Sequence, residues 1–260
     1  MKTATVTSTL DGHVATVRLD APPHNFLSAA LLGELADQLE VLDTQARCRA
    51  IVLTSSGKVF SAGAEFSSAT DSAVDPRPIY AQAMRLFDTR KPTVAAIQGA
   101  AIGAGLGLAL TADFRIGCTQ TRFAANFTRL GFHPGFGLSH TLPRLVGIQM
   151  ASRMFYTGER IGGEQALSIG LLDELVPQDE LVQRAQAFAL EISHSAPLAV
   201  QTTRQTLSAN LAQQVRIANE RECSLQLEQF AHADFREGVA AGAERRLPVF
   251  EDRQLGRRQP

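Results

Sequence analysis

Two segments rich in glycine and alanine could present backbone N–H groups to a ligand. In residues 93–113, an apolar run is followed by Gly103 and Gly105 and then by an uncharged segment typical of a buried helix. In residues 58–66, an apolar strand end leads into the small residues 61–64. Small residues allow close approach to the backbone, and the first N–H groups of a helix have no internal partner. Two such turns could together hold negative charge.

The glycine turn has two other interpretations. Gly103 and Gly105 give the G-x-G of a dinucleotide fingerprint, but the third position is Leu108 and no acidic residue follows at the distance needed for a ribose. The small residues could also serve only a close helix contact. We therefore keep packing as an alternative and regard a dinucleotide site as the weakest interpretation.

Few side chains of this sequence are candidates for transferring a proton. His133, in a turn-rich segment, could act as base or acid near neutral pH, although a histidine bonded to loop backbone is an equal alternative. His140 and Arg129 are weaker candidates. The three cysteines are far apart, so neither a metal site nor a disulfide framework is expected, and their number indicates a reducing compartment.

The elements that would position these residues follow a β-β-α-β order and then continue as short βα units to about residue 176. Alternating residues around Asp11-Gly12 predict a hairpin over 3–20, and Ser28 can cap the next helix. Residues 50–55 read as a buried strand, residues 56–77 as a long loop and residues 78–88 as a helix. From residue 179 the pattern predicts helices at 179–193, 197–209 and 213–231.

The change to an all-helical pattern suggests two regions. We predict a core domain over residues 1–190 and a helical region over 191–260 that packs on a neighbouring subunit. The formal net charge of −1 over 260 residues argues against a nucleic-acid partner. No apolar run reaches the roughly 20 residues of a membrane helix, and the N-terminus lacks a signal-like segment, so we expect no membrane partner and a cytoplasmic location.

Several motifs together resemble the crotonase superfamily, the enoyl-CoA hydratase and isomerase family. The family patterns F-x-A-G-A-D and N-G-x-x-x-G-G-G-x-x-L are matched here by F-S-A-G-A-E and Q-G-A-A-I-G-A-G-L-G-L. Residues 19–35, 155–177 and 237–250 are similar to further family segments in the same order. The resemblance implies an α/β fold, a crotonase-like ββα spiral with a C-terminal helical trimerisation region, assembled as a trimer or a hexamer made of two trimers.

The resemblance also implies an acyl-CoA thioester as substrate, within fatty acid metabolism, with coenzyme A as part of that substrate and no tightly bound cofactor. In the family, two backbone N–H groups hold the thioester carbonyl and the enolate oxygen that develops from it. By motif position these belong to Ala64 and Ala104. The substrate site would be lined by Ala62, Glu65, Phe66, Gly103, Gly105, Phe127 and Gly135. Of these, Glu65 is more easily interpreted as a loop anchor than as a base.

Three positions depart from the family pattern. The two hydratase glutamates correspond to Gly107 and Phe127, and the carboxylate of related isomerases corresponds to Gly135. None of the three can move a proton, which argues against ordinary hydration, a lyase reaction. One alternative is a hydrolase or lyase of 1,3-dicarbonyl or acyl-CoA substrates that uses His133. Another is an acyl-CoA-binding or assembly subunit without turnover.

Coenzyme A is expected to contact residues outside the two glycine turns. The resemblance places His24 and Phe26 in a coenzyme-contacting loop and Phe250 over the adenine. Lys58 could meet a phosphate, as could Arg245 and Arg246, although solvated surface charge is the commoner meaning of such side chains.

Overall fold

The larger of two β-sheets carries the long buried strands. The computed structural model describes residues 4–64 and 74–251. The strand order in this sheet is β1-β2-β3-β4-β6-β9. The strands span Thr5–Asp11 (β1), Val14–Asp20 (β2), Ala50–Ser55 (β3), Thr93–Ile97 (β4), Phe114–Cys118 (β6) and Glu174–Val176 (β9). The β1–β2 pair is the antiparallel hairpin that the sequence predicts, and the remaining pairs are parallel.

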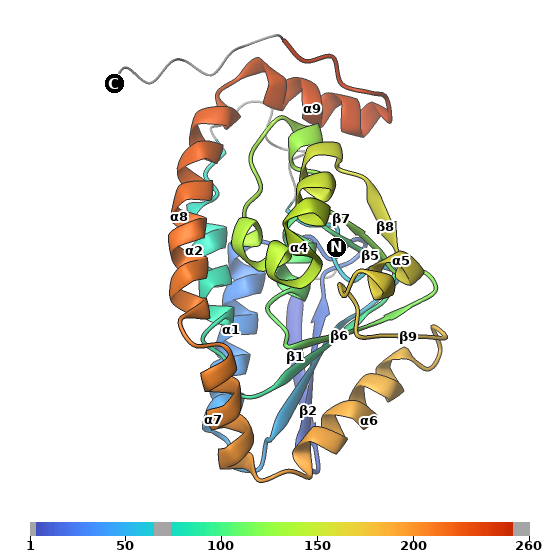
Figure 1. Cartoon of the computed structure of the whole chain (residues 1–260), viewed down its shortest axis with the longest axis vertical. Coiled ribbons are helices and arrows are strands. Elements are labelled where there is room, and N and C mark those ends of the chain that lie inside the picture. Colours follow the sequence, from blue (N-terminus) through green and yellow to red (C-terminus); the bar gives the residue numbers. More distant parts are fainter. Residues whose placement is uncertain (1–3, 65–73, 252–260) are drawn as a thin grey trace.

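Helices cover the two faces of this sheet, which explains why every residue of β3 and β4 is buried (Figure 1). Val52 and Val94 pack toward α6 (Leu181–Ser193), whereas Ile51 and Leu53 share a core with α1 (Ala29–Thr44). The side chain of Ser28 accepts a hydrogen bond from the Leu31 N–H at 3.1 Å, as its predicted capping role requires.

A smaller sheet lies beside the glycine turn. It contains β5 (Ala100–Ile102), β7 (Arg122–Ala124) and β8 (Arg160–Gly162), and the short helices α3 (Ala104–Ala109) and α5 (Gly163–Ser168) follow β5 and β8. The sequence predicts one strand before the turn, but the chain changes sheets at Gly99. A Cβ at Gly99, whose φ is +60°, would lie 2.1 Å from the Lys58 carbonyl oxygen, so only glycine fits this bend.

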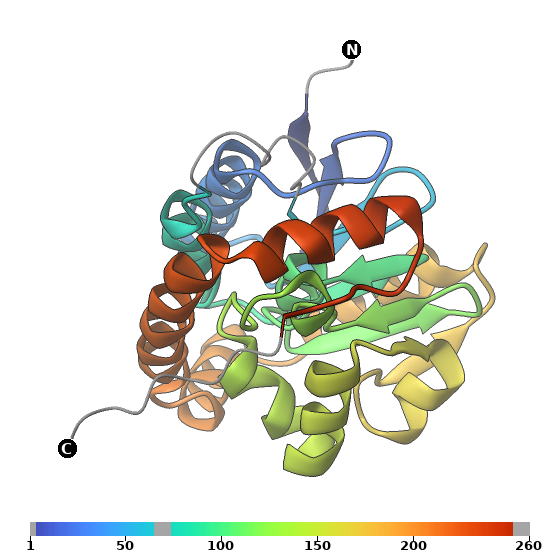
Figure 2. The same ribbon diagram turned by 90° about the horizontal axis from the view of Figure 1, so that it is seen from above.

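The remaining helices pack around these sheets. They are α2 (Arg77–Leu86), the 3₁₀ turn η1 (Thr128–Leu130), α4 (Leu138–Thr157), α7 (Pro197–Leu207), α8 (Leu211–Phe230) and α9 (Ala233–Glu244). Helix α8 contacts both α2 and α4, and α9 crosses above η1 (Figures 1 and 2). Among the described helices, none is long and apolar enough to cross a membrane.

The C-terminal helices are attached to the core of their own chain. Arg204 of α7 donates to both oxygens of Asp113 at 2.8–2.9 Å, and Arg216 of α8 pairs with Asp88. The boundary predicted at residue 190 falls inside α6, so the chain leaves the sheet layer only after Ser193. A separate C-terminal domain and its trimerisation stay predictions.

Candidate active site

A cavity of about 280 Å³ lies between the two glycine and alanine turns, the start of α2 and the end of α8. Its lining contains the predicted site residues Ala62, Ala64, Gly103, Ala104 and Phe127. Most of the other lining residues are apolar; the full remaining set is Gly63, Val74, Asp75, Pro76, Ile79, Tyr80, Ile102, Asn126, Leu130, Phe132, Gln226 and Phe230. The structure therefore brings residues from distant parts of the chain to one cavity.

A short parallel bridge holds the two turns side by side. Ser61 pairs with Ala101, the Ser61 N–H donates to the Ala100 oxygen at 3.0 Å, and the Ile102 N–H donates to the Ser61 oxygen at 3.0 Å. Gly63 has a φ of +92°, and a Cβ there would lie 2.7 Å from the Ile102 oxygen. This close approach requires glycine at position 63.

In the first turn, residues 61–64, most backbone N–H groups already donate hydrogen bonds within the protein. The Ala62 N–H donates to the His24 oxygen at 3.0 Å, and the Gly63 N–H donates to Ser61 Oγ at 3.1 Å. Ser61 Oγ in turn donates to the Asn25 oxygen at 2.8 Å. Among the described residues, the Ala64 N–H donates to no other group of the protein, so it remains available at the cavity.

The second turn leaves a matching donor. The Gly103 N–H donates to the Ala124 oxygen at 2.9 Å, and α3 begins at the next residue, Ala104. As the first residue of the helix, Ala104 has no intrahelical acceptor for its N–H. A Cβ at Gly105 would lie 2.4 Å from the Ser61 oxygen, so glycine there lets α3 approach the first turn. Within the described residues, the N–H groups of Ala64 and Ala104 are thus both unused, and both residues line the same cavity.

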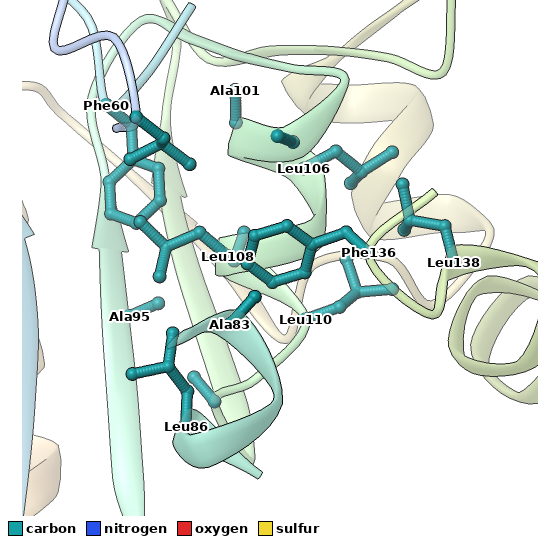
Figure 3. Close-up of a cluster of buried hydrophobic side chains, with 14 of the residues drawn as sticks. Phe60, Ala83, Leu86, Ala95, Ala101, Leu106, Leu108, Leu110, Phe136 and Leu138 are labelled. Atoms are coloured by element: carbon teal, nitrogen blue, oxygen red, sulfur yellow. The ribbon is translucent and has the colours of Figure 1, made fainter. Parts of the chain in front are cut away.

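At Gly107 and Gly135, the space that a side chain would need is occupied by the side chains of Phe136 and Tyr80. At Gly107 a Cβ would lie 2.5 Å from the ring of Phe136, which reaches among the apolar side chains around α3 (Figure 3). At Gly135 a Cβ would lie 1.8 Å from the Tyr80 hydroxyl oxygen. Phe127 itself lines the cavity and packs edge-on against Phe132.

Two ionisable side chains, Asp75 and Tyr80, line the cavity within the described part of the chain. Asp75 is exposed and accepts hydrogen bonds from Arg77, which hold the pKa of its carboxyl below the usual range. Burial raises the pKa of Tyr80 above its ordinary value, so its phenol stays protonated at neutral pH. The Tyr80 hydroxyl donates to Gln226 Oε1 at 2.8 Å.

Sequence reasoning missed both Tyr80 and Gln226. Tyr80 lies inside an ordinary helical pattern, and Gln226 lies in the region that the sequence suggested for oligomerisation. No local motif marks either residue. Only the packing of α8 against α2 brings them together at this cavity.

The structure does not bring His133 to the two unused donors. His133 lines a second cavity, of about 450 Å³, together with Ser139, Phe155 and Tyr156. Its Nδ1 donates to the Pro134 oxygen at 2.7 Å, and its backbone N–H donates to Gln229 Oε1 at 2.6 Å. The structure thus contains the hydrogen bond to loop backbone that the sequence left as an alternative, and the proton-transfer role of His133 stays a prediction.

The two weaker candidates also have structural contacts. His140 lies on α4, where burial lowers the pKa of its ring, and Arg129 Nε donates to the Thr157 oxygen. Neither residue lines the cavity between the turns.

The residues expected to meet the coenzyme lie outside this cavity. His24 and Lys58 are exposed, His24 packs edge-on against Phe26, and Phe250 is exposed near α9. Glu65 and Phe66 lie outside the described residues. Arg246 is already paired with Glu237 and Glu244. Across residues 4–64 and 74–251, no three metal-ligating side chains gather.

Comparisons with known proteins cover nearly the whole chain. Residues 9–253 match the family model described as enoyl-CoA hydratase/isomerase. A 2,3-dehydroadipyl-CoA hydratase from Escherichia coli is 34% identical over 88% of this chain and 91% of its own. A crotonyl-CoA hydratase from Syntrophomonas wolfei is 33% identical over 87% of this chain and 89% of its own.

Solved structures agree with the sequence comparisons. An enoyl-CoA hydratase/isomerase from Pseudoalteromonas atlantica superposes with a TM-score of 0.86 at 29% identity, covering 95% of this chain and 100% of that one. The structure of EchA1_1 from Mycobacterium paratuberculosis gives a TM-score of 0.86 at 26% identity, covering 97% of this chain and 100% of that one. The arrangement of sheets and helices described above is therefore the one shared by these proteins.

Proposed function

Because this chain belongs to the enoyl-CoA hydratase/isomerase family, we propose that it binds an acyl-CoA thioester and polarises its carbonyl with two backbone N–H groups. Those of Ala64 and Ala104 line one cavity and donate to no other group in the described part of the chain. This pair of unused donors is the observation that carries the proposal.

Two converging N–H groups suit an oxygen that gains negative charge. Polarising the thioester carbonyl stabilises an enolate at the neighbouring carbon, and fixed backbone donors need no rearrangement as that charge develops. Any residue other than proline at positions 64 and 104 keeps the backbone donor, so alanine serves as well as glycine. Coenzyme A enters this scheme as part of the substrate.

We further propose that the reaction differs from the hydration named for the relatives. Adding water to a double bond needs one group to activate water and one to protonate carbon. The family resemblance places these groups at positions 107 and 127, which are Gly107 and Phe127 here. The space beside Gly107 is filled by Phe136, so a neighbouring acid cannot readily take the missing position.

The donor role can be tested without knowing the reaction. Proline at position 104 deletes the N–H while suiting the first position of a helix, and Gly103 lacks the Cβ that a following proline would strain. We expect wild type to bind butyryl-CoA more tightly than its thioether analogue, which has no carbonyl, by about 3- to 10-fold per donor. Ala104→Pro should reduce this preference, measured by calorimetry.

The matched control is Ala104→Gly, which keeps the N–H at the same position. It should retain the thioester preference of the wild type. An equal affinity of the wild type for thioester and thioether would contradict the donor role, as would an unchanged preference in Ala104→Pro.

Measuring crotonyl-CoA turnover tests whether the protein is a hydratase. Crotonyl-CoA hydration should be absent from the wild type under conditions where a related hydratase is active. Because no carboxylate other than Asp75 lines the cavity in the described residues, binding without turnover is the second candidate function. Hydration of crotonyl-CoA at a rate typical of enzymes would contradict the proposed departure from hydratase chemistry.

A further inference from the structure

Ser61 lies where the two turns meet. Its N–H donates to the Ala100 oxygen and its own oxygen accepts from the Ile102 N–H, both at 3.0 Å. On its other side lies α3, which begins at Ala104 and comes so close that a Cβ at Gly105 would be 2.9 Å from the Cβ of Ser61. The contacts of Ser61 therefore fix the separation between the first turn and the start of α3.

The hydroxyl of Ser61 both donates and accepts within the protein. The Asn25 backbone oxygen can only accept, so the Ser61 proton points toward it, at 2.8 Å between the oxygens. The same Oγ accepts from the Gly63 N–H at 3.1 Å. Ser61 is 0% exposed and is not among the described residues that line the cavity. Ser61 can therefore influence a ligand there only through other groups.

The hydrogen bond between Gly63 and Ser61 restricts the peptide unit that carries the Ala64 N–H. Gly63 lacks a Cβ, so its backbone is intrinsically free to adopt many conformations. The Ser61 hydroxyl holds Gly63 by its N–H, and the Leu27 N–H holds it by its carbonyl oxygen at 2.8 Å. The peptide between residues 63 and 64 is trans and planar, so its C=O and N–H point in opposite directions. Fixing the carbonyl of Gly63 therefore fixes the direction of the Ala64 N–H.

This direction matters because two donors must meet one oxygen. A hydrogen bond weakens steeply as its angle departs from linear, and a developing charge is stabilised best by donors that are already in place. If Gly63 could rotate, the Ala64 N–H would sample several directions, few of which suit an oxygen that also binds the Ala104 N–H. Restricting the turn therefore favours a ligand with a carbonyl over the same ligand without one.

We propose that Ser61 is a positioning residue that aligns the Ala64 N–H with the N–H of Ala104 on one carbonyl oxygen. Its hydroxyl restricts the rotation of Gly63, and its backbone fixes the separation of the two turns. This inference rests on the proposed acyl-CoA function and adds the residue on which the alignment of the two donors depends.

The test uses Ser61→Ala, which removes the hydroxyl. Calorimetry compares the binding of butyryl-CoA with that of its thioether analogue. We expect the preference for the thioester to fall by about 3- to 10-fold, the worth of one hydrogen bond, while the affinity for the thioether stays nearly unchanged.

Infrared spectroscopy of isotope-labelled butyryl-CoA reports directly on the carbonyl. Hydrogen bonds to the oxygen weaken the C=O bond, so the stretching band should lie at lower frequency on the wild type than in free butyryl-CoA. On Ser61→Ala the band should return part of the way toward the frequency of the free ligand. A role of Ser61 in folding alone would not move this band.

Ser193→Ala is the matched control. Ser193 is buried at the end of α6, its hydroxyl donates to the Leu190 oxygen at 2.7 Å, and no described residue of α6 lines the cavity. This variant also loses a buried hydroxyl and should keep both the thioester preference and the band position. Circular dichroism establishes that each variant is folded. If Ser61→Ala does not fold, Ser61→Cys replaces it, because a thiol has a similar shape but forms weaker hydrogen bonds, and it should change the preference in the same direction.

The outcomes separate this inference from the function on which it rests. An unchanged preference and an unchanged carbonyl band in the folded Ser61 variant overturn the positioning role and leave acyl-CoA binding intact. An equal loss of affinity for thioester and thioether also overturns it, because that pattern indicates a structural role alone. A wild type that binds no acyl-CoA, or that binds thioester and thioether equally, overturns the proposed function of the two donors and this inference together.

Discussion

The ring of Phe136 occupies the space that a side chain at Gly107 would need. Phe136 is fully buried with a φ of +65°, a backbone conformation that aromatic residues rarely adopt. Its ring lies against the apolar residues around α3 (Figure 3). Any side chain introduced at position 107 would therefore have to displace the ring of Phe136.

We predict that Gly107→Ala destabilises the chain by about 1–3 kcal/mol, because the new methyl group overpacks against Phe136. Gly107→Glu should lose more stability and gain no crotonyl-CoA hydration. Urea unfolding measures the free energy, and Gly33→Ala in α1 is the control. A Cβ at Gly33 would meet only the Gln82 side chain, at 3.4 Å, so this variant should be neutral or gain up to about 1 kcal/mol. Unchanged stability in Gly107→Ala would contradict the close packing.

Helix α8 holds the segment between η1 and α4 through its buried polar face. Gln226 and Gln229 bind the backbone of His133, and Glu222 accepts from the N–H groups of Gly137 and Ser139 at 2.7 and 2.8 Å. The carboxylate of Glu222 is fully buried and lies at the N-terminus of α4, where negative charge is favourable. The same helix therefore positions both Phe136 and the partner of Tyr80.

We expect Glu222→Gln to destabilise the chain by about 1–3 kcal/mol, since both oxygens accept hydrogen bonds and an amide N–H₂ would face another donor. The midpoint of urea unfolding should fall. Glu228→Gln, at an exposed position of the same helix, should leave the midpoint unchanged. Similar midpoints for both variants would show that α8 does not hold this segment through Glu222.

At the scale of the whole molecule, α7 stands apart from the other helices. It has no buried residue within the chain, and Leu198 and Leu207 are 75% and 77% exposed. Such side chains often become buried when copies associate. This surface is consistent with the trimer or hexamer that the sequence predicts for the C-terminal region.

We predict that the protein sediments at three or six times the mass of the chain. Leu207→Glu should shift the distribution toward the single chain, because a charge would be buried at the interface. Val41→Glu on α1, also at an exposed apolar position, is the control and should not shift it. A wild-type monomer at all concentrations would contradict the trimerisation prediction.

Local patterns were sufficient for much of the fold. The Asp11-Gly12 hairpin, the Ser28 cap and the buried strands depend on short-range geometry and apolar periodicity, so the sequence predicts them correctly. The extra strand β5 was missed because the bend at Gly99 is enforced by the Lys58 carbonyl, which is distant in sequence. The last helix, α9, was not distinguished from the general helical pattern of the C-terminal region.

The sequence by itself determined the backbone part of the candidate site. Turns need particular small residues, so Gly63, Gly103 and Gly105 mark where N–H groups can be exposed, whatever side chains surround them. Only the tertiary structure decided which side chains face these donors. It places His133 at the second cavity and brings Tyr80 and Gln226, which are 146 positions apart, to the lining of the cavity that contains Ala64 and Ala104. The physical reason is that a cavity wall is formed by helices packing across the chain, and no local pattern encodes which of their side chains meet there.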